Sequence, residues 1–301
     1  GLQLVALLIV GSVLAFAPSD VRVDRDDAHF QEAYREGDYR HMAAHLAEIA
    51  RRQPWQVDLW ERAGFFAQRG QDADLAIVYF EQAQTLDVLS LEGQVTLGTL
   101  YERRGDTNLA EEVWSAAEPS PQAAKYLANL HRDRGDFPAA VEAWQQYLAL
   151  QGEVTPEAYF ELGSLLAAVE PARALTYLEQ ASGAIPRAEK LLEALGNVRD
   201  EEPAYQQVVA GQGLASLDEW RLAGFAFRRA LELRPDYAQA WAYWGEALQH
   251  VPNSEGDPLD ALRKALELDP ASSMVNIFLG TYWQREDDHR KALEYYQAAE
   301  G

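Results

Sequence analysis

The chain has 301 residues, of which 48 are acidic and 26 are basic, so its net charge is −22, and it contains no cysteine. This acidic balance argues against a nucleic-acid partner and against binding to an anionic membrane surface, because phosphate groups are bound by concentrated Lys and Arg. The absence of cysteine excludes disulfides and thiolate catalysis. At 48% hydrophobic residues, the chain is able to bury a continuous core.

The first predicted element is an apolar run from Leu2 to Ala17, interrupted only by Gln3 and Ser12. As a helix it would span about 24 Å, which is shorter than a hydrocarbon core of roughly 30 Å. Three interpretations compete for residues 1–20: a membrane anchor, which we favour, a secretory signal peptide, and a buried helix that caps the rest of the chain. We expect a membrane contact through residues 2–17 and a membrane-anchored protein with its repeats on the extracytoplasmic side.

After this run, a small residue recurs about every 34 residues. Its positions are Gly64, Gly98, Ala128, Gly163, Gly211, Gly245 and Gly280. A large side chain follows most of them about sixteen positions later, at Phe80, Trp114, Trp144, Phe227 and Tyr296. Two helices cross closely where one offers a hydrogen or a methyl group and the other fills the gap with a bulky side chain. A period of this length indicates an array of helix-turn-helix repeats.

Glycine and aspartate fall between the two helices of several copies, as in Arg104-Gly105-Asp106 and Arg134-Gly135-Asp136. Glycine supplies the left-handed residue after one helix, and aspartate is able to cap the next. These turns support the same register as the small residues.

The segment Ala204–Pro235 carries the whole pattern, with Gly211 at its eighth place, Ala223 at its twentieth and Phe227 at its twenty-fourth. It resembles the tetratricopeptide repeat (TPR), a 34-residue helix-turn-helix unit. The resemblance covers about nine tenths of the chain. It implies an all-α protein, a right-handed TPR superhelix of about eight repeats, to which the sequence adds an N-terminal apolar helix. Because Arg outnumbers Lys by 22 to 4, we expect a bacterial source.

The spacing also predicts how the repeats are grouped. A 48-residue gap between Gly163 and Gly211 leaves a surplus, residues 188–203, that is typical of an inserted short helix followed by a polar loop. We therefore expect five repeats over residues 23–187 and three over 204–301, the last of them truncated, with any hinge at the insert.

The sequence offers little evidence for a catalytic, metal or nucleotide site. His41 and His45 lie four apart on a predicted helix, a spacing able to hold a metal, but two histidines on a polar face are the simpler interpretation. Gly211-Gln212-Gly213 imitates a dinucleotide loop without a preceding strand. No nucleophile motif and no pairing of an acid with a base occurs. We predict no catalytic residues, no metal, no cofactor and no enzymatic activity.

In the TPR family the first helix of each pair lines a concave groove. Carrying the groove-facing places over gives a predicted partner-binding groove of Glu61, Phe65, Arg69, Thr99, Arg103, Lys125, Asn129, Arg132, Phe160, Tyr205, Gln212 and Glu246. Rings mixed with polar groups are typical of a peptide-binding channel. The family's clamp for chaperone carboxylates fits poorly, because Glu161 stands where an asparagine is needed and would repel the ligand.

The leading hypothesis is a non-catalytic protein-protein interaction scaffold, membrane-tethered and extracytoplasmic, that binds a protein or peptide segment in the concave groove. One alternative is the C-terminal TPR region of a larger polytopic membrane enzyme of the O-antigen ligase or polysaccharide polymerase type. Another is a structural repeat protein that self-assembles end to end.

Overall fold

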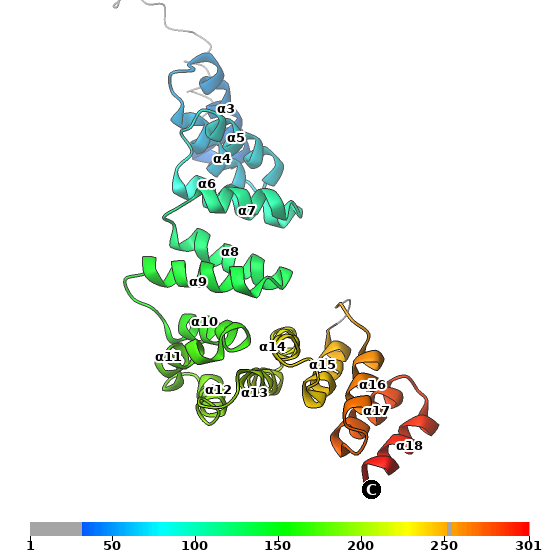
Figure 1. Cartoon of the computed structure of the whole chain (residues 1–301). Coiled ribbons are helices and arrows are strands. Elements are labelled where there is room, and N and C mark those ends of the chain that lie inside the picture. The colour runs from blue at the N-terminus through cyan, green and yellow to red at the C-terminus, as the bar shows by residue number, and fades with distance from the viewer. Residues whose placement is uncertain (1–31, 252–254, 301) are drawn as a thin grey trace, which may run out of the picture. The chain divides into compact units, whose positions relative to one another are not determined.

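The computed structural model describes residues 32–251 and 255–300, and all regular secondary structure in these ranges is helical (Figure 1). The chain divides into two compact units, residues 1–123 (unit 1) and 124–301 (unit 2), with the boundary inside helix α8. The predicted all-helical class, an α–α solenoid of paired helices, is confirmed. The grouping into five and three repeats stays a prediction.

Unit 1 is built from consecutive helices that pack in antiparallel pairs. They are α3 (Tyr39–Arg52), α4 (Asp58–Arg69), α5 (Ala73–Thr85), α6 (Leu91–Arg104), α7 (Thr107–Ala116) and the first turn of α8 (Pro121–Arg134). The contacts of α4 with α5 and of α6 with α7, which are expected within a repeat, are extensive, and the contact of α3 with α4 is equally extensive.

Unit 2 contains the rest of α8 and the ten helices that follow. These are α9 (Phe137–Leu150), α10 (Pro156–Val169), α11 (Pro171–Ser182), α12 (Pro186–Gly196), α13 (Pro203–Ser216), α14 (Trp220–Leu233), α15 (Ala238–His250), α16 (Pro258–Leu268), α17 (Ser273–Arg285) and α18 (His289–Glu300). Helix α12 covers most of the segment that the sequence assigns to an inserted helix. Helix α10 contacts α9, α11, α12, α13 and α14, so residues 162–168 are all buried.

The predicted pairing of small with large residues is confirmed at the glycines. A Cβ atom on Gly64 would lie 2.6 Å from the ring of Phe80, and one on Gly98 would lie 2.2 Å from Nε1 of Trp114. In unit 2, a Cβ on Gly211 would lie 2.4 Å from the ring of Phe227. Real Cβ contacts of this length do not occur, so only glycine lets the second helix approach this closely.

The turns within repeats use glycine and aspartate as predicted, with one difference. Gly105 and Gly135 have φ values of 93° and 81°, in the left-handed region that favours glycine. Asp136 accepts a hydrogen bond from the backbone N–H of Ala139 and so caps α9. Asp106 makes no side-chain cap on α7 and instead binds the guanidinium of Arg104.

Asp38, the N-cap of α3, provides a pH test of this capping. Its carboxylate binds the imidazole of His41 and accepts a hydrogen bond from the His41 backbone N–H, which together hold the pKa of Asp38 below its usual value of 3.8. Because the folded pKa is depressed, the cap contributes fully above the unfolded pKa of about 3.9 and is lost as pH falls through the folded value. We expect a carboxyl NMR titration of Asp38 with a midpoint below 3.8, and a midpoint at or above that value would contradict the cap.

The predicted location requires a correction. No helix among the described residues is long and apolar enough to cross a membrane. The run from Leu2 to Ala17, to which the anchor, the signal peptide and the N-terminal apolar helix were assigned, lies outside the described residues. The finding contradicts the predicted membrane-anchored, extracytoplasmic location, which is not carried further. The alternative of a larger polytopic membrane enzyme stays a prediction.

Candidate functional site

In unit 1 the structure brings two predicted groove residues, Phe65 and Arg69, into one cavity. The cavity has a volume of about 480 Å³ and is also lined by Arg62, Phe66, Gln68, Glu92 and Thr96, from α4 and α6. Phe65 is half-buried, and its ring meets Phe80 edge-on with the centroids 5.1 Å apart. Packing against the fully buried Phe80 holds Phe65 in place, so part of its ring is presented to the cavity on a rigid helix.

Arg69 and Arg103 occupy equivalent places in consecutive repeats of unit 1, and both are exposed. Neither forms a hydrogen bond or an ion pair with another residue in the described part of the chain, although the chain carries an excess of carboxylates. Arginine presents five donors that match a carboxylate in two-pronged geometry. These two side chains are therefore available to a ligand.

The other two predicted groove residues of unit 1 serve the fold. The carboxylate of Glu61 accepts a hydrogen bond of 3.1 Å from the backbone N–H of Ser90 and another from its hydroxyl, which fixes the start of α6. The hydroxyl of Thr99 donates to the carbonyl of Val95 at 2.7 Å.

In unit 2, the predicted groove residues Arg132 and Glu246 are engaged in ion pairs. Arg132 binds the carboxylate of Glu161, and its Nη2 lies 2.8 Å from Oε2 of Glu219. Burial lowers the pKa of Arg132, but the charges of Glu161 and Glu219 raise it by more, so the net pKa lies above its ordinary value. Glu246 pairs with Arg285 at 3.1 Å and contacts His250 at the same distance. Arg132 and Glu246 therefore each have an oppositely charged partner within unit 2.

The remaining predicted groove residues of unit 2 differ in exposure. Lys125, Asn129 and Tyr205 are exposed and Gln212 is half-buried. Phe160 is only 6% exposed, with the guanidinium of Arg187 over its ring at 5.1 Å. Phe160 is therefore removed from the predicted groove, because α12 to α14 cover the helix that carries it.

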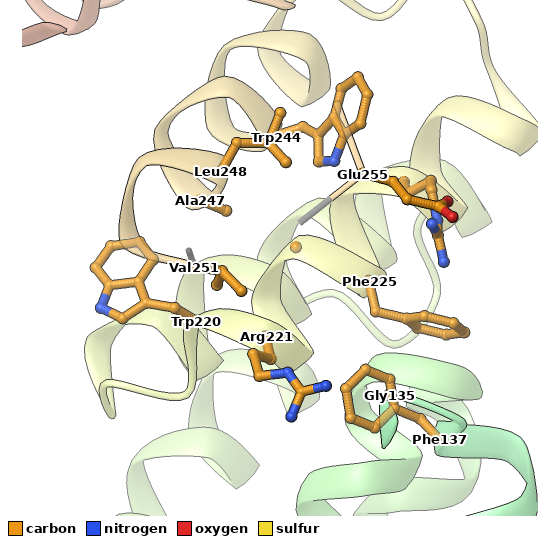
Figure 2. Close-up of a pocket in the computed structure, with 12 residues that line it drawn as sticks. Gly135, Phe137, Trp220, Arg221, Phe225, Trp244, Ala247, Leu248, Val251 and Glu255 are labelled. Carbon is orange, nitrogen blue, oxygen red and sulfur yellow. The ribbon is translucent and has the colours of Figure 1, made fainter. Parts of the chain in front are cut away.

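Unit 2 also contains two connected cavities that the sequence does not predict. The larger, the polar cavity, has a volume of about 500 Å³ and is lined by Arg132, Asp133, Phe137, Asp218, Glu219, Trp220, Arg221, Leu222, His250 and Val251. The smaller, the apolar cavity, has a volume of about 110 Å³ and is lined by Gly135, Phe137, Trp220, Arg221, Gly224, Phe225, Arg228, Trp244, Ala247, Leu248, Val251 and Glu255 (Figure 2). Four residues are common to both linings, so one cavity opens into the other.

These cavities exist because the α8–α9 turn meets α14, which lies more than 80 residues later in the chain. Phe137 and Phe225 lie next to each other in Figure 2, with their centroids 5.2 Å apart at an interplanar angle of 83°. Nη1 of Arg221 donates to the carbonyl of Asp133 at 2.8 Å. A Cβ on Gly135 would lie 3.1 Å from Nη2 of Arg221, so the glycine permits this approach. No local sequence pattern specifies such a contact.

His41 and His45 lie with their ring centroids 6.4 Å apart. Within residues 32–251 and 255–300, no group of three or more His, Cys, Asp or Glu side chains is placed to hold a metal ion.

No protein-family model matches the chain, and no curated protein matches it either. Among solved structures, MamA is similar at 19% identity and a TM-score of 0.30, over 60% of this chain and 89% of MamA. The Cut9–Hcn1 hetero-tetramer of APC/C is similar at 18% identity and a TM-score of 0.37, over 95% of this chain and 52% of that one. Naa15/Naa10 bound to HypK-THB is similar at 14% identity and a TM-score of 0.42, over 93% and 63% of the two chains. The bacterial source stays a prediction.

Proposed function

We propose that this chain is a non-catalytic protein-interaction scaffold that binds an extended segment of a partner protein on the α4/α6 face of unit 1. The observation that carries the proposal is the cavity in which a rigidly held ring, Phe65, lies beside an exposed arginine, Arg69, that has no partner among the described residues. Aromatic residues and arginine are enriched in the cores of protein interfaces, where a few side chains carry most of the binding energy.

The charges on this face favour a segment that carries carboxylates. Arg69 and Arg103, one repeat apart, would each bind an Asp, a Glu or a C-terminal carboxylate, while an apolar side chain of the segment packs on Phe65. Glu92 lines the same cavity and repels a carboxylate placed next to it. The register of the segment is therefore restricted by the repulsive charge of Glu92 and the attractive charges of Arg69 and Arg103, while Arg62 in the same lining is already paired with Asp58.

This proposal is tested by selecting twelve-residue peptides from a display library on the whole chain, then measuring the enriched peptides by fluorescence polarisation. We expect enriched peptides to contain an apolar residue and at least one carboxylate. Arg69→Glu combined with Arg103→Glu should lower the affinity for these peptides by about a hundredfold, since each charge-assisted hydrogen bond contributes about 1.5 kcal/mol or more. Phe65→Ala should weaken them by about tenfold.

The matched control is Arg229→Glu, which changes the charge of an exposed arginine on α14 without touching unit 1. It should leave the affinity of the enriched peptides within about twofold at 0.15 M salt, because Arg229 pairs with Glu232 on its own helix and does not line the cavity. Peptides that bind the Arg69/Arg103 double variant as tightly as the original chain would refute the proposed site.

A further inference from the structure

We propose that the two connected cavities of unit 2 form a second binding site, which takes one aromatic side chain of a partner segment in the apolar cavity and an adjacent lysine or arginine in the polar cavity. This site shares no residue with the α4/α6 face of unit 1, and the proposal goes beyond the function proposed above. Each site can therefore fail its test without affecting the other.

The apolar cavity has the size and the walls for a single aromatic ring. Its volume of about 110 Å³ is somewhat smaller than the enclosed cavity of about 150 Å³ that binds benzene. Because this cavity is open on one side, a ring can enter it without being fully enclosed. In Figure 2, Phe137 and Phe225 lie on one side of the cavity, and Trp244 and Leu248 of α15 on another. A ring inserted here would pack against aromatic side chains, and such pairs contribute binding energy beyond the area that they bury.

The polar cavity next to it favours a peptide over a compact apolar molecule. It joins the apolar cavity through Phe137, Trp220, Arg221 and Val251, and, apart from Leu222, charged and polar side chains line the remainder. The main chain of a peptide needs hydrogen-bond partners for its N–H and C=O groups, while an aromatic side chain of the peptide needs an apolar pocket. Two cavities of opposite polarity that open into each other meet both needs.

The charges of the polar cavity favour a cationic neighbour for the ring. Its Arg132 is already bound to Glu161 and Glu219, and its Arg221 donates to the carbonyl of Asp133. The carboxylates of Asp133 and Asp218 are exposed and have no cationic partner in the described part of the chain, since Asp218 accepts only from the indole N–H of Trp220. A lysine or arginine beside the aromatic residue would pair with them.

Three capped tetrapeptides test the site on the whole chain: Ser-Lys-Phe-Ser, Ser-Lys-Ser-Ser and Ser-Asp-Phe-Ser, with capped phenylalanine as a fourth probe. Binding is followed through the indole N–H resonances in NMR spectra. We expect the Lys-Phe peptide to bind at least about tenfold more tightly than the Lys-Ser peptide, because it buries the ring. It should also bind about threefold more tightly than the Asp-Phe peptide at low salt.

Substitutions in each cavity show where the peptide binds. A Cβ on Gly224 would make an ordinary contact of 3.6 Å with Ala247, and Gly224 lines the apolar cavity, so the side chain of Gly224→Leu should occupy that cavity and reduce affinity by about tenfold or more. Asp133→Asn with Asp218→Asn removes both charges. Asparagine suits the positive φ of 66° at position 218 and still accepts from Trp220, so the preference for Lys-Phe over Asp-Phe should disappear. The control pair Asp200→Asn with Asp269→Asn, both exposed elsewhere in unit 2, should keep that preference.

The resonances of Trp220 and Trp244 provide a readout that does not depend on a variant folding. Binding should shift these two indole signals and leave those of Trp55 and Trp60 in unit 1 in place. Equal binding of the Lys-Phe and Lys-Ser peptides, or shifts confined to other tryptophans, would overturn the proposal. Capped phenylalanine binding as tightly as the Lys-Phe peptide would show a small aromatic ligand and overturn the peptide assignment.

Discussion

Replacing Gly98 with alanine should destabilise unit 1 by about 2 kcal/mol, although alanine is the better helix former. The added Cβ would lie 2.2 Å from Nε1 of Trp114, a side chain with no exposed surface. That indole donates to the carbonyl of Val95 at 3.2 Å and cannot retreat without losing its hydrogen bond. Overpacking of this kind costs about 1 to 3 kcal/mol or more, which exceeds the gain of about 1 kcal/mol in helix propensity.

The same substitution in a Trp114→Ala background is a stricter test, because there Gly98→Ala should stabilise the chain instead of destabilising it. Trp114→Ala alone should cost about 3 to 5 kcal/mol through the cavity that it leaves. With the indole gone, Gly98→Ala should stabilise the chain by up to about 1 kcal/mol. Hydrogen exchange at the backbone amides of α6 measures the local stability in each background. An equal loss in both would show that contact with Trp114 is not the cause.

The control for this series is Gly183→Ala. Gly183 follows α11 with φ −65° and ψ −19°, and a Cβ there meets no atom within 4 Å. Because alanine adopts this conformation without strain, the substitution should be neutral or slightly stabilising.

Arg132→Met should cost unit 2 about 2 kcal/mol, the second large effect. The side chain of Arg132 is 25% exposed and those of Glu161 and Glu219 are 35% and 23% exposed, so this network lies between a surface pair and a buried one. Removal of the arginine leaves the partly buried carboxylate of Glu161 without a cationic partner and leaves Glu219 with Arg187 alone. The loss is measured by hydrogen exchange in α8 and α14, which the network joins.

Two comparisons separate this explanation from a loss of packing. In a background of Glu161→Gln with Glu219→Gln, the same Arg132→Met change should be nearly neutral, because no stranded charge is left. Arg290→Met, at an exposed pair 3.4 Å from Glu294, should cost no more than about 0.5 kcal/mol. A cost at Arg132 that persists in the double-glutamine background would assign the effect to its alkyl chain.

The fold was predictable because its determinants are local and periodic. Gly98 faces Trp114 sixteen residues later, and Gly211 faces Phe227 at the same separation, so each helix pair carries its own specification. The same property explains why Phe65 and Arg69, which lie one turn apart on one helix, line the same cavity. Whether they bind a partner stays a prediction.

The candidate sites of unit 2 depend on contacts that the repeat pattern does not contain. Phe160 occupies a groove-facing place in its own repeat, yet helices from the insert and beyond cover it. The apolar cavity needs Phe137 and Phe225 to meet, and their separation along the chain is no multiple of the period. Such contacts join helices that belong to different repeats, as α10 and α14 do, so they are a property of packing and not of any one repeat.

The continuous burial of residues 162–168 in α10 has a consequence for how unit 2 can be shortened. A simple array tolerates deletion of an internal repeat, because each copy depends only on its two neighbours. Here α10 touches five helices, among them α14, so excising the α10/α11 hairpin would expose apolar faces on elements far apart in sequence. Residues from α9 to α14 should melt as a single cooperative block, and natural variation in the number of repeats should be confined to other parts of the chain.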